Sequence, residues 1–236
     1  MKVLGVIPVR LNSTRIPQKP LYKIKGKELV LHVYDRVKNY SGFSDLIVAC
    51  DSEVVKTLVE AHGGKAMMTS LEHKNGTERL TEVCEVLPNY DCYCIVNGDE
   101  ILVNPESITA SITSFKLNQW ADVTMLAVPY TQVGSTSDFK VVIDVNNRVM
   151  YISRNDIPSS ARNIVKTRLK AYHIMCFSKK ALGLYKNLDK SPIESIEDHE
   201  LLRFIEHGYN IHCTVVKDDC VSFDTMEDLD YILDRL

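Results

Sequence analysis

Residues 6–20, which read VIPVRLNSTRIPQKP, hold the densest group of side chains that could do chemistry. The basic and hydroxyl side chains in this loop are Arg10, Ser13, Thr14, Arg15 and Lys19. Its three prolines stop a helix from forming, because proline lacks an N–H group and fixes φ. Cationic and hydroxyl donors in one loop suit an anion with many oxygens, such as phosphate. A solvated basic loop has the same composition, so the residues alone leave both interpretations open.

The position of this loop in the chain allows a ligand site. The loop follows a short apolar run at 2–6 that is typical of a buried strand, and open α/β sheets bind ligands at the carboxyl ends of their strands. Asp99 follows a similar run, Cys92–Val96, and lies at the same edge if the two strands are parallel. Mg²⁺ takes one or two carboxylates together with phosphate oxygens. Asp99 is therefore a candidate metal ligand, and an acidic turn without a ligand is the alternative.

Three other groups could contribute to such a site. They are residues 222–225 before a closing helix, residues 76–79 at the start of another helix, and Glu194, Glu197, Glu200 and Arg203 at a spacing of three. Asp224 could bind a metal, or it could only help to cap the helix that follows. Arg79 could pair with a carboxylate. The glutamates would form a polar stripe, which ion pairs on a helix surface explain equally well.

Hydrophobic periodicity predicts the elements that position these groups. The first half alternates strands over 2–6, 45–50, 66–68 and 92–96 with helices over 28–40, 52–62, 77–87 and 105–119. Such repeated β–α units imply a largely parallel sheet covered on both faces. The second half predicts strands over 123–128, 141–144, 148–152, 168–177 and 211–216, and helices over 179–187, 192–207 and 226–236.

The organisation of the second half differs from that of the first. Asn146 and Asn147 predict a hairpin, because Asn tolerates turn conformations. Residues 139–177 are therefore expected to form an antiparallel excursion from the main sheet. The sequence has no repeat, low-complexity segment or linker, so we expect one domain over residues 1–236.

Composition argues against several classes of protein. The chain has 236 residues, 45% of them hydrophobic and 25% charged, with a formal net charge of −3. A general nucleic-acid binder usually carries a basic excess, and no apolar run approaches the ~20 residues of a membrane span. The motifs G-x-G-x-x-G and G-x-x-x-x-G-K-S/T are absent, which disfavours a Rossmann dehydrogenase or a P-loop NTPase. Seven scattered cysteines, without a C-x-x-C pair or an export signal, predict a cytoplasmic protein with reduced thiols.

The motifs together resemble those of the 3-deoxy-manno-octulosonate (Kdo) cytidylyltransferases, also called CMP-Kdo synthetases. The opening motif stands here as IPVRLNSTRIPQKPLYKIKGK at 7–27. The others are HKNGTERLTE at 73–82, NGDEILVNPE at 97–106, FKVV at 139–142, ISRNDIP at 152–158, SPIESIEDHELLR at 191–203 and FDTMEDL at 223–229. They occur in order along the whole chain, and the opening motif and the ordered set are specific.

The resemblance implies Mg²⁺-dependent transfer of CMP from CTP to the anomeric hydroxyl of an acidic 2-keto-3-deoxy sugar, with release of pyrophosphate. It also implies a three-layer α/β/α fold of the nucleotide-diphospho-sugar transferase type, with a mixed, mostly parallel sheet, in a homodimer joined through the second-half strands. By similarity, Arg10, Ser13, Arg15 and Lys19 would bind the CTP phosphates, Asp99 and Asp224 would ligate Mg²⁺, and Arg79, Asn97, Arg154, Glu197 and Glu200 would lie near the sugar acid. The implied catalytic set is Arg15, Lys19, Asp99 and Asp224.

The chain departs from the family pattern mainly on the sugar side. Asn97 stands where the pattern has Gln, Ile101 where it has Pro, and Ala171 where it has His, while His173 takes a neighbouring glycine position. The phosphate loop is intact. We therefore expect cytidylyl transfer to Kdo or to a variant such as an amino-substituted Kdo. The alternatives are transfer to another ulosonic or nonulosonic acid, and an inactive relative that only binds a sugar nucleotide. The choice of CTP over UTP rests on the resemblance alone.

Overall fold

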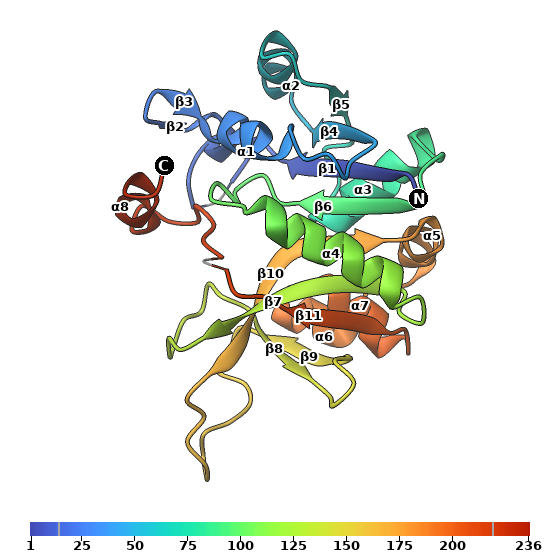
Figure 1. The fold of residues 1–236 in the computed structure, drawn as a ribbon, viewed down its shortest axis with the longest axis vertical. Helices are drawn as coiled ribbons and strands as arrows, with labels where there is room; N and C mark the ends of the chain where they lie inside the picture. Colours follow the sequence, from blue (N-terminus) through green and yellow to red (C-terminus); the bar gives the residue numbers. More distant parts are fainter. Residues whose placement is uncertain (14, 219) are drawn as a thin grey trace.

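The computed structural model describes residues 1–13, 15–218 and 220–236, so Thr14 of the basic loop lies outside the described residues. Its centre is a sheet whose main path runs β11-β7-β10-β6-β1-β4-β5 (Figure 1). In that order the strands are Ile211–Val215, Val123–Tyr130, Arg168–Phe177, Cys92–Val96, Val3–Val9, Asp45–Cys50 and Ala66–Met68. Neighbours along this path are parallel except at β10, which is antiparallel to both β6 and β7. The prediction of a mixed, mostly parallel sheet is confirmed.

Helices cover both faces of this sheet and give a three-layer fold (Figure 1). One face packs against α1 (Leu29–Val37), α2 (Glu53–Ala61) and α4 (Pro105–Leu117). The other packs against α3 (Gly76–Val86), α5 (Lys179–Asn187) and α7 (Leu201–Glu206). In β1, Leu4 and Val6 belong to the core beside α3, whereas Val3 and Ile7 belong to the core beside α1. This alternation follows from the two-residue period of a strand.

The second half contains the hairpin that Asn146 and Asn147 predict. It consists of β8 (Lys140–Ile143) and β9 (Val149–Ser153), and β8 also pairs with β10. The remaining short elements are η1 (Lys19–Leu21), β2 (Lys23–Ile24), β3 (Lys27–Glu28), α6 (Pro192–Glu197) and α8 (Asp228–Leu233). The closing helix α8 is thus shorter than the predicted 226–236. Within the described residues, every helix is too short or too polar to cross a membrane.

The single helix predicted over 192–207 is wrong, because the chain folds into α6 and α7 with a break between them. Asp198 ends α6 in the left-handed conformation with φ 56°, which Asp tolerates better than most residues. The carboxylate of Glu206, at the end of α7, accepts hydrogen bonds of 3.0–3.1 Å from backbone N–H groups in the first turn of α6. This contact satisfies N–H groups that a helix start leaves unpaired, and the regular spacing of the glutamates does not reveal it.

The loops that carry the candidate site residues lie at one edge of the sheet. The carboxyl ends of β1 and β6 meet there, because these strands are parallel neighbours. The first residues of β10 reach the same edge, because β10 runs in the opposite direction. The chain after β11 also passes here, where the Phe223 N–H donates to the Asp99 carbonyl oxygen at 3.0 Å. The edge therefore brings together segments that are far apart in the sequence, as expected for a ligand site in an open α/β sheet.

Candidate active site

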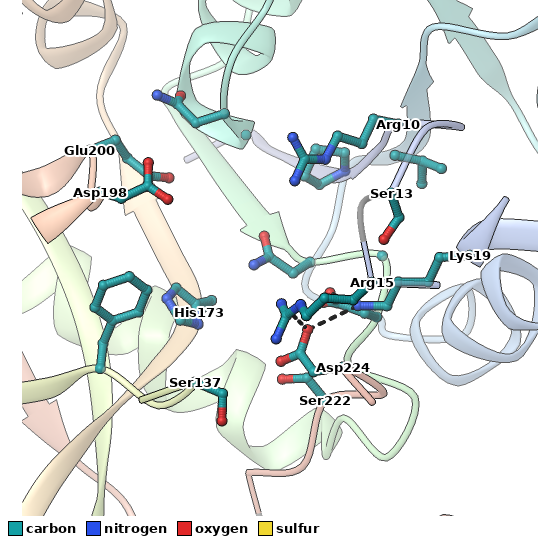
Figure 2. Close-up of a pocket in the computed structure, with 18 of the residues that line it drawn as sticks. Arg10, Ser13, Arg15, Lys19, Ser137, His173, Asp198, Glu200, Ser222 and Asp224 are labelled. Carbon is teal, nitrogen blue, oxygen red and sulfur yellow. Dashed lines mark hydrogen bonds and ion pairs between the residues drawn. The ribbon is translucent and has the colours of Figure 1, made fainter. Parts of the chain in front are cut away.

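A cavity of about 320 Å³ opens at this edge. The predicted residues in its lining are Arg10, Ser13, Arg15, Lys19, Arg79, Asn97, Asp99, Arg154, Glu200 and Asp224. Figure 2 shows the basic loop and Asp224 on one side of the cavity, and His173, Asp198 and Glu200 on the other. We call these the basic-loop side (Arg10, Ser13, Arg15, Lys19, Asp99 and Asp224) and the β10 side (Asp138, Phe139, Arg154, Lys170, His173, Asp198 and Glu200).

Three distant segments meet in a network of ion pairs on the basic-loop side. The Nζ of Lys19 donates to Asp99 Oδ2 at 2.6 Å and to Asp224 Oδ1 at 3.0 Å. The Nη2 of Arg15 donates to the same Asp224 oxygen at 2.8 Å (Figure 2). The first loop and two distant acids therefore converge on one rim of the sheet, as the sequence predicts.

A close approach of two loops positions Asp99. Where the loop after β6 passes β1, a Cβ added at Gly98 would lie 2.8 Å from Val9 Cγ2 and 3.0 Å from the Pro8 carbonyl oxygen. A side chain there would push the loop away from β1, so glycine is what lets the backbone before Asp99 lie this close. In the sequence Gly98-Asp99, the glycine thus allows the close approach to β1, and the aspartate supplies the carboxylate of the site.

The ion pairs set the charge states in this network. Burial alone would lower the pKa of Lys19, but the carboxylates of Asp99 and Asp224 outweigh it and raise that pKa. Burial would raise the pKa of Asp99, and the Lys19 ammonium outweighs it and lowers that pKa. Lys19 and Asp99 are therefore both charged at neutral pH. The neighbouring Glu100 differs, because burial and the Asp99 charge raise its pKa to about 8.

Asp99 and Asp224 fit a hard divalent cation. One oxygen of each lies within 3.0 Å of the same Lys19 nitrogen, so the two carboxylates converge on one point. Mg²⁺ prefers such oxygen ligands and completes its shell with phosphate oxygens and water. In residues 1–13, 15–218 and 220–236, no group of three or more His, Cys, Asp or Glu side chains could hold a metal. A cation at Asp99 and Asp224 would therefore complete its shell with water or with oxygens from a bound ligand.

Four residues predicted to lie near a sugar acid reach the cavity, but they are not equally available. Asn97, Arg154 and Glu200 line it, and burial raises the pKa of the Glu200 carboxyl. Arg79 also lines it, yet only 3% of its surface is exposed, and its guanidinium donates to Asp51 Oδ2 at 3.2 Å. The Arg79 guanidinium is thus already paired with Asp51. Its role in the cavity is to hold the wall in place, and its charge is not free to pair with a ligand.

Glu197 is the predicted site residue that does not line the cavity. Its carboxylate accepts hydrogen bonds from the hydroxyls of Tyr151 and Ser153 at 3.0 and 2.9 Å. It also accepts one from the Arg154 backbone N–H at 3.3 Å. Glu197 therefore fixes β9 and the backbone that carries Arg154, and its effect on the cavity is indirect.

The lining also contains residues that the predicted set lacks, among them Asp138, Phe139, Lys170, His173 and Asp198 on the β10 side. Asp138 and Lys170 form an ion pair at 2.6 Å. Lys170 and His173 are polar residues in the mostly apolar strand β10 and are only partly exposed. Polar residues in such a run are an informative signal that could have found them. Asp198 gives no such signal, because the sequence predicts a continuous helix over 192–207 that contains it.

Asp138 is expected to stabilise the fold in a pH-dependent way. Burial would raise its pKa, but hydrogen bonds from Lys170, Ser135 and Tyr130 outweigh this and lower it from 3.8 to about 2. A carboxyl with a lowered pKa stabilises the folded state above the unfolded-state value, and this contribution disappears as the pH falls through the folded-state value. We expect Asp138→Asn to lower the free energy of unfolding at pH 7 by about 1–2 kcal/mol.

Urea denaturation of the wild type and Asp138→Asn at several pH values measures this contribution. The gap in unfolding free energy should be largest above about pH 4 and shrink toward pH 2. A gap that stays constant over this range would contradict the ion-pair explanation.

Comparison with known proteins agrees with the geometry of this site. Residues 4–211 match the family model described as Cytidylyltransferase. The 3-deoxy-manno-octulosonate cytidylyltransferase of Fusobacterium nucleatum subsp. nucleatum is 36% identical, with 100% of this chain and 97% of that protein covered. The 8-amino-3,8-dideoxy-manno-octulosonate cytidylyltransferase of Shewanella baltica is 32% identical, with 97% and 96% covered.

Structural comparison gives the same result. A solved structure of CMP:2-keto-3-deoxy-manno-octonic acid synthetase complexed with CTP superposes with a TM-score of 0.92 at 31% identity, covering 100% of this chain and 98% of that one. The solved structure and this chain therefore share one fold over the full length, including the edge of the sheet where the cavity opens. These matches show that the chain is a nucleotidyltransferase and belongs to the cytidylyltransferase family.

Proposed function

We propose that this enzyme transfers CMP from CTP to the anomeric hydroxyl of Kdo or a Kdo variant and releases pyrophosphate. The observation that carries the proposal is the convergence of Arg15 and Lys19 with Asp99 and Asp224 at one rim of the cavity. The names of the relatives point to the acceptor, since they refer to 3-deoxy-manno-octulosonate and to its 8-amino derivative. The similar solved structure, which holds CTP, points to the nucleotide.

The reaction brings like charges together, and the cavity is suited to offset them. The acceptor hydroxyl has to attack an anionic α-phosphate in line with the departing pyrophosphate, while the sugar acid carries its own carboxylate. Transfer of this kind gains mainly from positioning and electrostatic stabilisation. Arg10 and Ser13 would bind phosphate oxygens. Arg15 and Lys19 would stabilise the negative charge that accumulates on the pyrophosphate.

Asp99 and Asp224 would hold Mg²⁺. When bound, this ion would neutralise phosphate charge and lower the pKa of the attacking hydroxyl. The remaining protein groups need no covalent intermediate, because the acceptor hydroxyl itself is the nucleophile. Asn97, Arg154 and Glu200 would orient the sugar acid on the opposite side of the cavity, and Arg79 and Glu197 would hold the surrounding wall.

Pyrophosphate release tests this function directly. CTP and UTP are each incubated with Mg²⁺ and with Kdo, 8-amino-3,8-dideoxy-manno-octulosonate or a nonulosonic acid, and the products are identified by mass spectrometry. We expect release with CTP and an octulosonate, and little with UTP. If pyrophosphate is released only with a nonulosonic acid, the acceptor is a nonulosonic acid and not Kdo. If no acid causes pyrophosphate release, the protein is better explained as an inactive relative that only binds a sugar nucleotide.

The assembly and the compartment belong to the same proposal. A homodimer joined through the second-half strands would cover the apolar side chains that the β8–β9 hairpin exposes, namely Val145 and Met150. All seven cysteines are free and buried, which suits a reducing compartment such as the cytoplasm. Light scattering would test the dimer, and Met150→Glu should shift the protein toward the monomer.

A further inference from the structure

The β10 side of the cavity presents acidic groups opposite the basic loop. The break between α6 and α7 turns the carboxylates of Asp198 and Glu200 toward the cavity (Figure 2). The Asp198 side chain is 87% exposed and lies 4.0 Å from Arg154 Nη2, at the limit of an ion pair. Asp198 also has the left-handed backbone that ends α6. A non-glycine residue held in this conformation at a cavity is a reason to look for a function.

The cations on this side already have partners. The Arg154 guanidinium lies 4.0 Å from the centre of the Phe139 ring. Its Nη1 donates to two backbone carbonyl oxygens of the loop before β8 at 2.9 and 3.1 Å. Lys170 pairs with Asp138 at 2.6 Å. These contacts leave Asp198 and Glu200 as the carboxyl groups that this side offers to a ligand, and Glu200 already accepts one hydrogen bond, from the Thr77 hydroxyl at 3.2 Å.

His173 adds an uncharged hydrogen-bonding group to the same wall. The register of β10 against β7 shifts between Tyr172 and Met175, and such bulges often aim a side chain into a site. The His173 ring stacks on His199 with centroids 5.6 Å apart, so its position is supported from behind. Burial lowers the pKa of both imidazoles, which are therefore neutral at pH 7. Within the described residues the His173 ring makes no hydrogen bond, so it can accept one from a ligand.

We propose that Asp198, Glu200 and His173 form the subsite for the tail of the acceptor sugar and select a tail that bears an amine over the same tail bearing a hydroxyl. An ammonium group has three donors and a positive charge, so it can satisfy both carboxylates and the neutral imidazole. A hydroxyl has one donor and no charge, so it leaves part of this wall unsatisfied. The sugar carboxylate would be repelled here and belongs nearer the basic-loop side. The inference rests on the proposed transfer to an octulosonate.

The test compares two acceptors that differ only at the tail, Kdo and 8-amino-3,8-dideoxy-manno-octulosonate. Wild-type kcat/KM should be about tenfold higher for the 8-amino acceptor than for Kdo. Asp198→Asn should reduce this ratio of kcat/KM values to about twofold or less. The change should appear in KM more than in kcat, since the tail is remote from the reacting hydroxyl. Glu60→Gln removes an exposed carboxylate on α2, outside the cavity lining, and should leave the ratio as in the wild type.

A second variant separates hydrogen bonding from packing. His173→Phe keeps a ring to stack on His199 and removes the nitrogens, so it should raise the KM for the amino sugar more than the KM for Kdo. Equal kcat/KM for the two acids in the wild type, or an unchanged ratio in Asp198→Asn, would overturn the inference.

Failure of the subsite is distinguishable from failure of the proposed function. If neither acid releases pyrophosphate from CTP, calorimetric binding of both acids in the presence of α,β-methylene CTP tests the subsite without turnover. The same preference for the amino sugar, and its loss in Asp198→Asn, would support the subsite. Equal affinities would overturn it.

Discussion

Replacing Asp99 by Asn is expected to lower kcat by about 10²- to 10³-fold while the fold is retained. The amide keeps the shape of the side chain but removes the charge that, with Asp224, would hold Mg²⁺. The Lys19 ammonium keeps its second partner, Asp224 Oδ1 at 3.0 Å. Because the Asp99 side chain is 28% exposed, its amide retains access to water, and the free energy of unfolding should change by about 1 kcal/mol.

A carboxylate at the other end of the same strand provides the matched control. Asp91 lies just before β6 and accepts a hydrogen bond from the Lys2 backbone N–H at 2.7 Å, at the opposite edge of the sheet. Asp91→Asn should therefore leave kcat unchanged. Pyrophosphate release at saturating CTP measures both variants, and thermal unfolding checks that they are folded. Turnover near the wild-type rate in Asp99→Asn would remove the assignment of Asp99 as a metal ligand.

The layers of the fold could be predicted because they follow from local patterns. The runs that became β4 and β6 are short, apolar and separated by amphipathic helices, which is typical of buried parallel strands. The order of strands could not be predicted in the same way. The insertion of β10 between β6 and β7 depends on contacts between residues far apart in the sequence, such as the Cys176–Cys94 and Cys176–Thr124 pairings.

The same distinction applies to the site. Arg15, Lys19 and Asp99 could be predicted, because they follow strands whose carboxyl ends meet at one edge. The Asp138–Lys170 ion pair could not, since it joins a loop and a strand through a single contact at 2.6 Å and has no characteristic spacing. The position of Asp198 at the cavity could not be predicted for another reason. The acidic spacing continues across the helix break, and the contacts of Glu206 that stabilise the break are tertiary.

Replacing Lys19 by Met is expected to have opposite effects on catalysis and on metal affinity. The ammonium would stabilise charge on the departing pyrophosphate, so its loss should lower kcat/KM for CTP by about 10²- to 10³-fold. In the structure the same ammonium lies between Asp99 and Asp224, at 2.6 and 3.0 Å. A divalent cation that uses both carboxylates has to displace it. Without Lys19 this competition disappears, and Mg²⁺ affinity in the absence of CTP should rise by about tenfold.

Thermal unfolding with and without Mg²⁺ measures the second effect, because an ion that binds only the folded state stabilises it by mass action. Lys19→Met leaves two carboxylates close together with Arg15 as their remaining cation, so the variant should unfold at a lower temperature without Mg²⁺. It should then gain more stability than the wild type when Mg²⁺ is added. Lys23→Met is the control, since Lys23 lies in β2 beside the loop and pairs with Glu28 at 3.5 Å. An equal gain from Mg²⁺ in wild type and Lys19→Met would mean that Lys19 and the cation do not share the two carboxylates.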